Sequence, residues 1–384
     1  MTLHRKHGEF VRIARNSISI NDPSAVQQIY SHKSNFAKGD FYDAFFQVRP
    51  VVFNARDIAL HQKKRKYMNP AFSARALSEF EPYMDADLLL WKQKLLTMTE
   101  QRKSANLDFA VWTNYLAFDV IGSFAFGRSF GFTETGEDSY NLISTVDTRG
   151  EVLNALGTVP AWLRPYMKYN YLDTFWSSGL RATANLEKIG RSAYLDRKNS
   201  QDTRKDLLSF LFNAKDADTK ENIPEEEIVA EAISFIVGGS DTTSSTMTNV
   251  IDIVSRDQKL QRQIQTELDE AFPGAQDGYW VAPDRIAGTL PLLNAILKEV
   301  MRIRPTSAIG LERVTPPGGR VISGRFIPEG TVVSVPTYGV LQDERVFKNP
   351  ERFDPQRWLG EDASALTEFF LPFSTGPRAC IGRK

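Results

Sequence analysis

The sequence Phe373-Ser374-Thr375-Gly376-Pro377-Arg378-Ala379-Cys380-Ile381-Gly382 ends a Gly/Pro-containing loop at the chain's single cysteine. An arginine stands two residues before that cysteine, and a nearby cation lowers the pKa of a thiol. The thiolate is the form of cysteine that binds metals. The stretch therefore predicts a metal-binding thiolate on a loop. The alternative is that this lone cysteine is a small buried apolar side chain.

The rare residues and the charge balance exclude several classes of protein. One cysteine allows neither an intramolecular disulfide nor a multi-cysteine zinc or iron–sulfur site. The histidines, at positions 4, 7, 32 and 61, all lie early in the chain, which argues against a multi-histidine centre or a late triad histidine. Lys and Arg number 47 against 47 Asp and Glu, so nothing in the charge favours binding to nucleic acid.

Hydropathy predicts a globular chain. Hydrophobic residues make up 42% of the 384 residues, too many for a disordered protein. No stretch reaches the roughly 18 apolar residues that span a bilayer, and the start has no signal-peptide pattern. We therefore expect no transmembrane segment in the sequence given.

A long helix predicted over 224–254 has an unusual middle. Residues 238–246 read Gly-Gly-Ser-Asp-Thr-Thr-Ser-Ser-Thr, which are poor helix formers placed where a buried helix should be strongest. Small and hydroxylic residues let another body approach the backbone and interrupt the hydrogen-bond ladder. A tight helix crossing with a polar seam is the plain alternative. The acid and alcohol Asp241-Thr242 form a plausible proton-delivery pair at such a distortion.

A second motif is Glu299-Val300-Met301-Arg302, whose spacing puts both charged groups on one helix face. Because Glu9-Phe10-Val11-Arg12 fits the same pattern, a surface ion pair is the default interpretation. The apolar helix around Glu299 and the strands that follow it favour a more specific role.

Periodicity predicts one large, mainly α-helical unit with a small β-sheet region drawn from about 9–20 and 318–336. The helical bulk covers 22–305, with a long loop at 31–56, a kink or restart at Pro82 and a mixed region over 134–173. The helices are expected at 24–30, 60–69, 76–98, 107–126, 180–197, 204–213, 224–254, 255–272 and 290–302.

With these motifs in place, the chain resembles the cytochrome P-450 superfamily along its whole length. The pattern Phe373-x-x-Gly376-x-Arg378-x-Cys380-x-Gly382 is similar to that family's haem-binding loop. The motifs at 238–243 and 299–302 are similar to its oxygen-activating helix and K-helix. Pro355-Gln356-Arg357-Trp358 resembles the segment whose arginine completes the ion network, while the literal Pro350-Glu351-Arg352-Phe353 is a decoy.

The resemblance implies a P-450 fold over 1–384, a haem-thiolate loop at 373–382 and a bound haem b. It makes Cys380 the axial iron ligand and gives Asp241 and Thr242 the protonation of iron-bound dioxygen. Glu299, Arg302 and Arg357 become a structural network that braces the cysteine loop. The residues implied to hold the haem and its propionates are Phe373, Gly376, Arg378, His61, Arg65 and Arg313. In the His61-x-x-x-Arg65 motif, His61 stands where many family members have Trp.

Substrate and partner assignments follow from the same resemblance. The Phe-rich loop, Ser240 and Ser307 to Gly310, with Ala308 and Ile309 among them, are the substrate-facing candidates. An NADPH-dependent flavoprotein reductase would supply electrons. Lys63, Lys64 and Lys66 would form a basic face that docks the donor, or simply a solvated helix face.

The closer similarity is to a fungal group, the benzoate para-hydroxylases. It rests on the stretches 38–45, 53–57, 80–84, 114–119 and 333–336. Related fungal enzymes act in secondary-metabolite pathways, so the similarity narrows the relatives more than the substrate.

Family members usually carry an N-terminal membrane anchor, a helix after the haem cysteine and a C-terminal hairpin. The sequence begins just before its first strand and stops four residues after Cys380, so we expect a partial chain lacking these parts. The resemblance implies that the full-length family member resides in the endoplasmic reticulum membrane through that anchor.

Three functions remain open at this point. The leading one is a haem-thiolate monooxygenase that hydroxylates a hydrophobic or aromatic small molecule, in aromatic catabolism or secondary metabolism. The second is a truncated, inactive remnant without haem. The third is an isomerase or dehydratase that needs no external electrons, which the pair Asp241-Thr242 disfavours because such reactions have no dioxygen to protonate.

Overall fold

A computed structural model describes residues 2–101, 107–216, 219–274 and 281–383. These residues divide into two compact units. The first unit comprises the described residues within 2–39, 246–274 and 282–383, and the second comprises those within 40–245 together with Val281. The prediction of a single domain over the whole chain stays a prediction.

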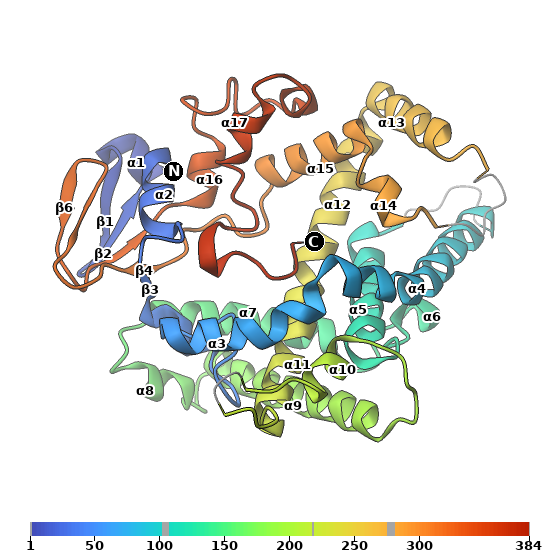
Figure 1. The fold of residues 1–384 in the computed structure, drawn as a ribbon, viewed down its shortest axis with the longest axis horizontal. Coiled ribbons are helices and arrows are strands. Elements are labelled where there is room, and N and C mark those ends of the chain that lie inside the picture. The colour runs from blue at the N-terminus through green and yellow to red at the C-terminus, as the bar shows by residue number, and fades with distance from the viewer. Residues whose placement is uncertain (1, 102–106, 217–218, 275–280, 384) are drawn as a thin grey trace. The chain divides into compact units, whose positions relative to one another are not determined.

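The first unit contains the β-structure, formed from both ends of the chain (Figure 1). A five-stranded sheet has the order β1-β2-β7-β4-β3, and β5 and β6 form a separate antiparallel pair. The strand β2 pairs in parallel with β7, with Ser17 opposite Val332 and Ser19 opposite Ser334. The strands are β1 Phe10–Ala14, β2 Ser17–Ile20, β3 Ala37–Lys38, β4 Arg313–Val314, β5 Arg320–Ile322, β6 Arg325–Ile327 and β7 Val332–Ser334.

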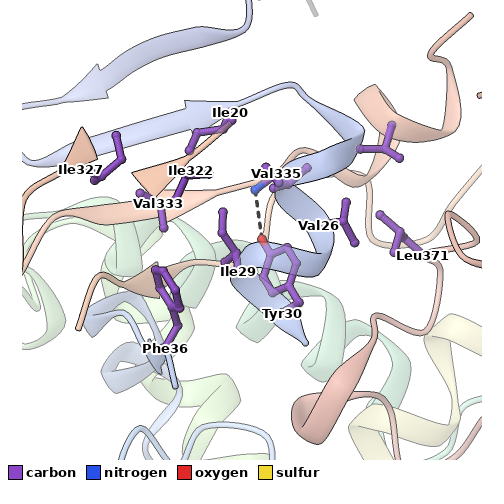
Figure 2. Packing of buried hydrophobic residues seen from close by; sticks show 12 residues of the cluster. Ile20, Val26, Ile29, Tyr30, Phe36, Ile322, Ile327, Val333, Val335 and Leu371 are labelled. Carbon is purple, nitrogen blue, oxygen red and sulfur yellow. Dashed lines mark hydrogen bonds between the residues drawn. The ribbon is translucent and has the colours of Figure 1, made fainter. Parts of the chain in front are cut away.

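Helix α2, Pro23–Tyr30, packs its apolar face against this sheet (Figure 2). Asp22 caps its start by accepting a hydrogen bond from the Ser24 amide, and Pro23 occupies the first turn, where no amide hydrogen is needed. Ile29 is fully buried, which stabilises the fold by about 1.5–3 kcal/mol. The Tyr30 hydroxyl donates to the Leu311 carbonyl at 2.7 Å and accepts from the Val335 amide at 3.0 Å, so the helix is also fixed by hydrogen bonds.

Short helices complete the first unit. Helix α15, Pro291–Ile303, buries Ile296, Glu299, Val300 and Arg302. The remaining elements are α1 Thr2–His7, α13 Gln258–Ala271, α14 Asp284–Ala287, α15 Pro291–Ile303, α16 Thr337–Leu341, η4 Pro355–Trp358, α17 Ala363–Thr367 and η5 Gly376–Arg378.

The second unit is built from helices. Helices α7 and α9 pack against each other, and Gly179 of α9 lets Val152 of α7 approach its backbone closely. Its elements are η1 Asp40–Phe45, α3 Ile58–Met68, η2 Asn69–Phe72, α4 Ala74–Gln101, α5 Phe109–Phe126, α6 Phe132–Thr135, α7 Leu142–Thr158, α8 Arg164–Lys168, α9 Thr174–Asn199, α10 Leu207–Phe212 and α11 Glu225–Gly239. Helix α12, Asp241–Arg256, begins in this unit.

Helix α5 is the one described helix that is long and apolar enough to cross a membrane. It begins at the Asp108 cap and ends at Gly127 in the left-handed conformation. Of its 18-residue window, 56% is buried, and Leu116 and Phe118 are among its buried residues. These contacts are typical of a core helix rather than of an anchor.

The predicted fold class, mainly helical with a small sheet region, is confirmed. The helix expected over 224–254 divides into α11 and α12 at Ser240, inside the run of small and hydroxylic residues. The Ser240 hydroxyl donates to the Ile236 carbonyl at 2.7 Å, one turn back. A hydroxyl bonded in this way competes with the helix ladder, which is the physical reason for expecting a distortion here.

One local expectation was wrong and two were incomplete. The predicted loop at 31–56 contains β3 and η1, because β4 supplies a partner strand and the rings of Phe41, Tyr42 and Phe45 pack together. The mixed region at 134–173 contains the 17-residue helix α7, whose buried face packs on α9. Helix α4 continues through Pro82 without restarting.

Candidate functional site

Cys380 lies at the end of a tightly folded loop, with its side chain exposed. The Cys380 amide donates to the Phe373 carbonyl at 2.9 Å, and the Ala379 amide donates to the Gly376 carbonyl at 3.1 Å. These bonds close the loop around the single turn η5 and keep the thiol accessible. An exposed thiol on a closed loop can bind a metal centre from one side.

Gly376 shows why this loop needs a glycine. Its φ is +72°, a conformation that L side chains rarely adopt. A Cβ built on Gly376 would lie 1.9 Å from the Tyr30 carbonyl oxygen, so the loop backbone rests directly on the end of α2. The cysteine loop is therefore supported by the core shown in Figure 2.

Three cationic side chains of the first unit, Lys38, Arg313 and Arg378, lie close enough together for their charges to interact. Lys38 on β3 is directly opposite Arg313 on β4 in the strand register, and the two side chains are 7% and 2% exposed. Burial lowers the pKa of Lys38 well below its ordinary value, and the charges of Arg313 and Arg378 lower it further. Such a cluster favours an anionic group as its ligand.

The predicted ion network is assembled in the first unit and is fully buried at its centre. Glu299 accepts from Arg302 Nε and Nη2, both at 2.9 Å, and from Arg357 Nε at 3.0 Å. The Trp358 ring nitrogen and the Asp354 amide, each at 2.9 Å, fill its remaining sites. Arg302 also donates to the Leu341 carbonyl at 2.8 Å. Arg352 contributes its backbone carbonyl rather than an ion pair.

Asp241 and Thr242 start α12 in the second unit, immediately after the helix break. Burial raises the pKa of Asp241 to about 6, with a smaller contribution from the charge of Asp147. The Thr242 hydroxyl donates to the Gly238 carbonyl at 3.0 Å. A carboxyl with a pKa near 6 can both hold and release a proton at physiological pH.

Helix α3 carries the other predicted haem-binding residues. His61 is buried, and Arg65 is half-buried with its Nε bonded to the Asn69 side chain at 3.1 Å. Lys64, between them, is 1% exposed and is ion-paired with Glu227 and Glu231 of α11. Lys64 is therefore neither a docking cation nor part of a solvated face, because both expectations require it at the surface.

The substrate-facing candidates lie apart in the chain and in different units. Ser240, in the second unit, is fully buried and bonded to the Ile236 carbonyl. Ser307, Ala308 and Ile309 form an irregular segment of the first unit, where the Ala308 carbonyl accepts from the Tyr338 amide at 3.0 Å. Ile309 is 62% exposed, which leaves an apolar side chain available for contact.

Comparison with known proteins identifies the family. The family model described as "Cytochrome P450" matches residues 1–384. The chain belongs to the cytochrome P450 family. Membership makes it a P450 monooxygenase, confirms the resemblance stated above, and implies a haem held by a cysteine thiolate.

This P450 is similar in sequence to fungal monooxygenases. It is 37% identical to benzoate 4-monooxygenase bphA of Aspergillus niger, over 99% of this chain and 77% of that protein. It is 31% identical to cytochrome P450 monooxygenase ORF11 of Penicillium roqueforti, over 100% of this chain and 79% of that protein. Both relatives are named as monooxygenases, and only the first name states a substrate.

A solved structure supports the fold of this P450. The cytochrome P450DA haem domain superposes with a TM-score of 0.81, covering 99% of this chain and 81% of that one. The sequence identity is 19%, so this likeness concerns the fold alone. The expected P-450 fold is confirmed.

The residues of the first unit fit a haem. An exposed thiol suits the axial iron position, and the cations Lys38, Arg313 and Arg378 suit the two propionate carboxylates that haem carries. The fit to a haem therefore rests on the chemistry of these side chains, a thiol and three cations, near the cysteine loop.

Sequence reasoning missed three members of these groups. The burial of Lys38 has no local signal, because its two-residue strand forms only against β4, which lies far away in the sequence. Trp358 was noted as a motif letter, yet its ring nitrogen completes the Glu299 network. No local pattern pairs Lys64 with Glu231, because they lie 167 positions apart on different helices.

Proposed function

We propose that this P450 hydroxylates a hydrophobic, aromatic small molecule, with electrons supplied from NADPH through a flavoprotein reductase. The closed, exposed Cys380 loop beside the Lys38, Arg313 and Arg378 cations is the observation that carries the proposal. The similarity to a benzoate 4-monooxygenase supports an aromatic substrate. The family resemblance supports a location at the endoplasmic reticulum membrane for a full-length family member.

Cys380 is proposed as the axial ligand, and the bound haem would supply the oxidising chemistry. In the first unit, Arg313 and Arg378 neutralise propionate charge, with Lys38 as a third cation, while Phe373 and Gly376 shape the loop. In the second unit, His61 and Arg65 are proposed for the same class of contact. Arginine suits this task because its fork of donors matches a carboxylate.

Asp241 is proposed to hold and release the proton that the reaction consumes, and Thr242 to pass it on. Its half-buried carboxyl with a pKa near 6 suits this task. Glu299, Arg302 and Arg357 are proposed to brace the segment that leads to the cysteine loop, without contacting substrate.

The decisive experiment is a carbon-monoxide difference spectrum of the reduced chain expressed with haem supplied. A thiolate-type Soret band in the wild type, lost in Cys380→Ser, is the expected result. Full haem uptake by both proteins with the same spectrum would overturn the ligand assignment. No haem in the wild type would favour the alternative of an inactive remnant.

A further inference from the structure

The outer face of the hairpin formed by β5 and β6 is apolar and open to solvent. Val321 of β5 lies directly opposite Phe326 of β6, and the two side chains are 62% and 64% exposed. Ile322 and Ile327, the next residue of each strand, are buried in the core shown in Figure 2. A strand pair with one buried face normally carries polar residues on the other face. Both outward positions of this hairpin depart from that rule.

The hairpin is fixed in place, so its outer face is preformed. Ser323 and Gly324 make the turn with φ values of +47° and +76°, the left-handed conformation that a tight two-residue hairpin requires. The Ser323 amide donates to the Gln28 side chain of α2 at 2.9 Å. Gly319 leaves room for the Phe326 ring, since a Cβ there would lie 2.5 Å from it. A face held in this way can bind a partner without first becoming ordered.

Exposed cations surround this apolar face. Arg320 and Arg325 belong to the two strands, and the Arg325 guanidinium lies 4.4 Å from the centre of the Phe10 ring of β1. The hairpin therefore lies beside β1, on which α1 packs (Figure 1). The stretches 2–20 and 318–330 together hold six Lys and Arg residues and two Glu residues, in a chain whose formal net charge is zero. All six of these cations are exposed.

Little of this positive charge is neutralised by neighbours. Among the residues that the structure describes, Arg5 is the one member of the six with an ion pair, a 3.9 Å contact with Glu351 in which both side chains are mostly exposed. Such a pair is weak. Of the two acids, Glu9 is already paired with Arg345, which lies outside these stretches. The surface therefore combines an apolar centre with a positive surround.

We propose that the outer face of the β5–β6 hairpin, with the cations around it, docks on an anionic lipid bilayer. Val321 and Phe326 enter the boundary between headgroups and acyl chains, and the arginines meet the anionic headgroups, whose oxygens match guanidinium donors. A bilayer offers a negative surface with an apolar layer directly beneath it, which is the combination that this face complements. The inference goes beyond the proposed function and uses no part of the haem chemistry.

The test is co-sedimentation of the full haem-loaded chain with vesicles of phosphatidylcholine alone and of phosphatidylcholine with about one third phosphatidylserine. We expect the wild type to bind the anionic vesicles at least about tenfold more tightly, and this preference to weaken as the salt concentration rises. The double variant Val321→Ser/Phe326→Ser should lose about tenfold or more of its affinity for the anionic vesicles. Arg320→Gln should lose about fivefold on anionic vesicles and almost nothing on neutral ones.

Leu359→Ser and Arg285→Gln are the matched controls. Each removes one exposed side chain of the first unit outside the hairpin and β1, the first apolar and the second cationic. Both should bind the vesicles as the wild type does. Losses in these controls equal to those in the hairpin variants would overturn the inference, because binding would then not depend on this face.

Wild-type affinity for the anionic vesicles in the double variant, with both proteins folded by circular dichroism, would also overturn the inference. So would a wild type that binds neither kind of vesicle, which would favour a protein as the partner of this face. If the double variant does not fold, the comparison of Arg320→Gln with Arg285→Gln decides. A chain without a thiolate spectrum overturns the proposed function instead, and the vesicle comparison then tests the hairpin separately.

Discussion

Arg302 meets Glu299 through two hydrogen bonds of 2.9 Å, one from Nε and one from Nη2, and neither side chain is exposed to solvent. Replacing Glu299 by Gln would leave the buried guanidinium of Arg302 without its counter-charge. We expect the free energy of unfolding to fall by about 3–5 kcal/mol, measured by urea denaturation.

The matched control for that change is Glu9→Gln, which removes one of the two carboxylate partners of Arg345 at the surface, the other being Asp343. Both of these side chains are about half exposed, so the loss should stay below about 1 kcal/mol. Equal losses in the two variants would show that burial of the Glu299 network adds nothing.

Gly376→Ala should displace the cysteine loop, because the added methyl group would overlap the Tyr30 carbonyl at a φ of +72°. Strain at such a position costs on the order of 1–3 kcal/mol before the clash is counted. We expect a large loss of bound haem, measured from the Soret absorbance per chain. Gly360→Ala, where nothing lies within 4 Å, should keep its haem. Normal haem content in Gly376→Ala would contradict this account of the loop.

Turnover should depend on pH through the buried carboxyl of Asp241, and the charge of Asp147 should shift the midpoint of that dependence. A proton donor must be protonated, so the turnover number should fall as pH rises through the Asp241 pKa of about 6. Asp147→Asn removes a like charge and should move this midpoint to lower pH, whereas Asp196→Asn, an exposed partner of Arg128, should not. Asp241→Asn should lower turnover by about 10²–10⁴-fold and should abolish the fall of the turnover number near pH 6. An unmoved midpoint in Asp147→Asn would refute the coupling.

Glu231 should make the second unit less stable as pH rises towards neutrality. Burial raises its pKa from 4.5 to about 7, partly offset by Lys64. Between these values the folded state binds the proton that the unfolded state has lost, so stability present below pH 4.5 is lost as pH rises through 7. The total is on the order of 3 kcal/mol. Glu231→Gln should remove this decrease in stability with pH. Thermal unfolding measured from pH 4.5 to 8 tests the prediction, and the same decrease in the variant as in the wild type would contradict it.

Lys38 should make the stability of the haem-free chain rise with pH, which is the opposite of the effect of Glu231. Its pKa is lowered by burial and by two arginines, so above that pKa the unfolded state binds a proton that the folded state does not. Stability of the haem-free chain should rise with pH until the ordinary lysine pKa of 10.5 is reached. Lys38→Met should remove this rise and weaken haem retention, measured by transfer of haem to apomyoglobin. Faster release from wild type than from Lys38→Met would exclude Lys38 as a propionate partner.

The sequence predicted the fold best where local chemistry decides it. The β region predicted at about 9–20 holds the strands β1 and β2, and the helix break falls inside the hydroxylic run around Ser240, because alternation and helix-breaking residues are local properties. The strand β3 was missed because its two residues pair only when β4 is present. Helix α7 was missed because its face is defined by contact with α9.

The same distinction applies to the candidate site. The cysteine loop and the pair Glu299 and Arg302 were found because their members are close in sequence. The burial of Lys38 and the pairing of Lys64 with Glu231 depend on tertiary contacts, so no spacing rule reveals them.

The parallel pairing of β2 with β7 has a consequence for how the chain is made. Asn16, just before β2, bonds to the Gly330 carbonyl 314 positions later, so the hairpin of β1 and β2 leaves the ribosome long before its neighbour exists. At ordinary rates of synthesis the wait is roughly 15–60 s. During that time one edge of β2 is unpaired and open to association with other chains. The sheet that supports the cysteine loop is thus completed only after β7 has been synthesised, and chaperone demand before that point should fall mainly on the hairpin of β1 and β2.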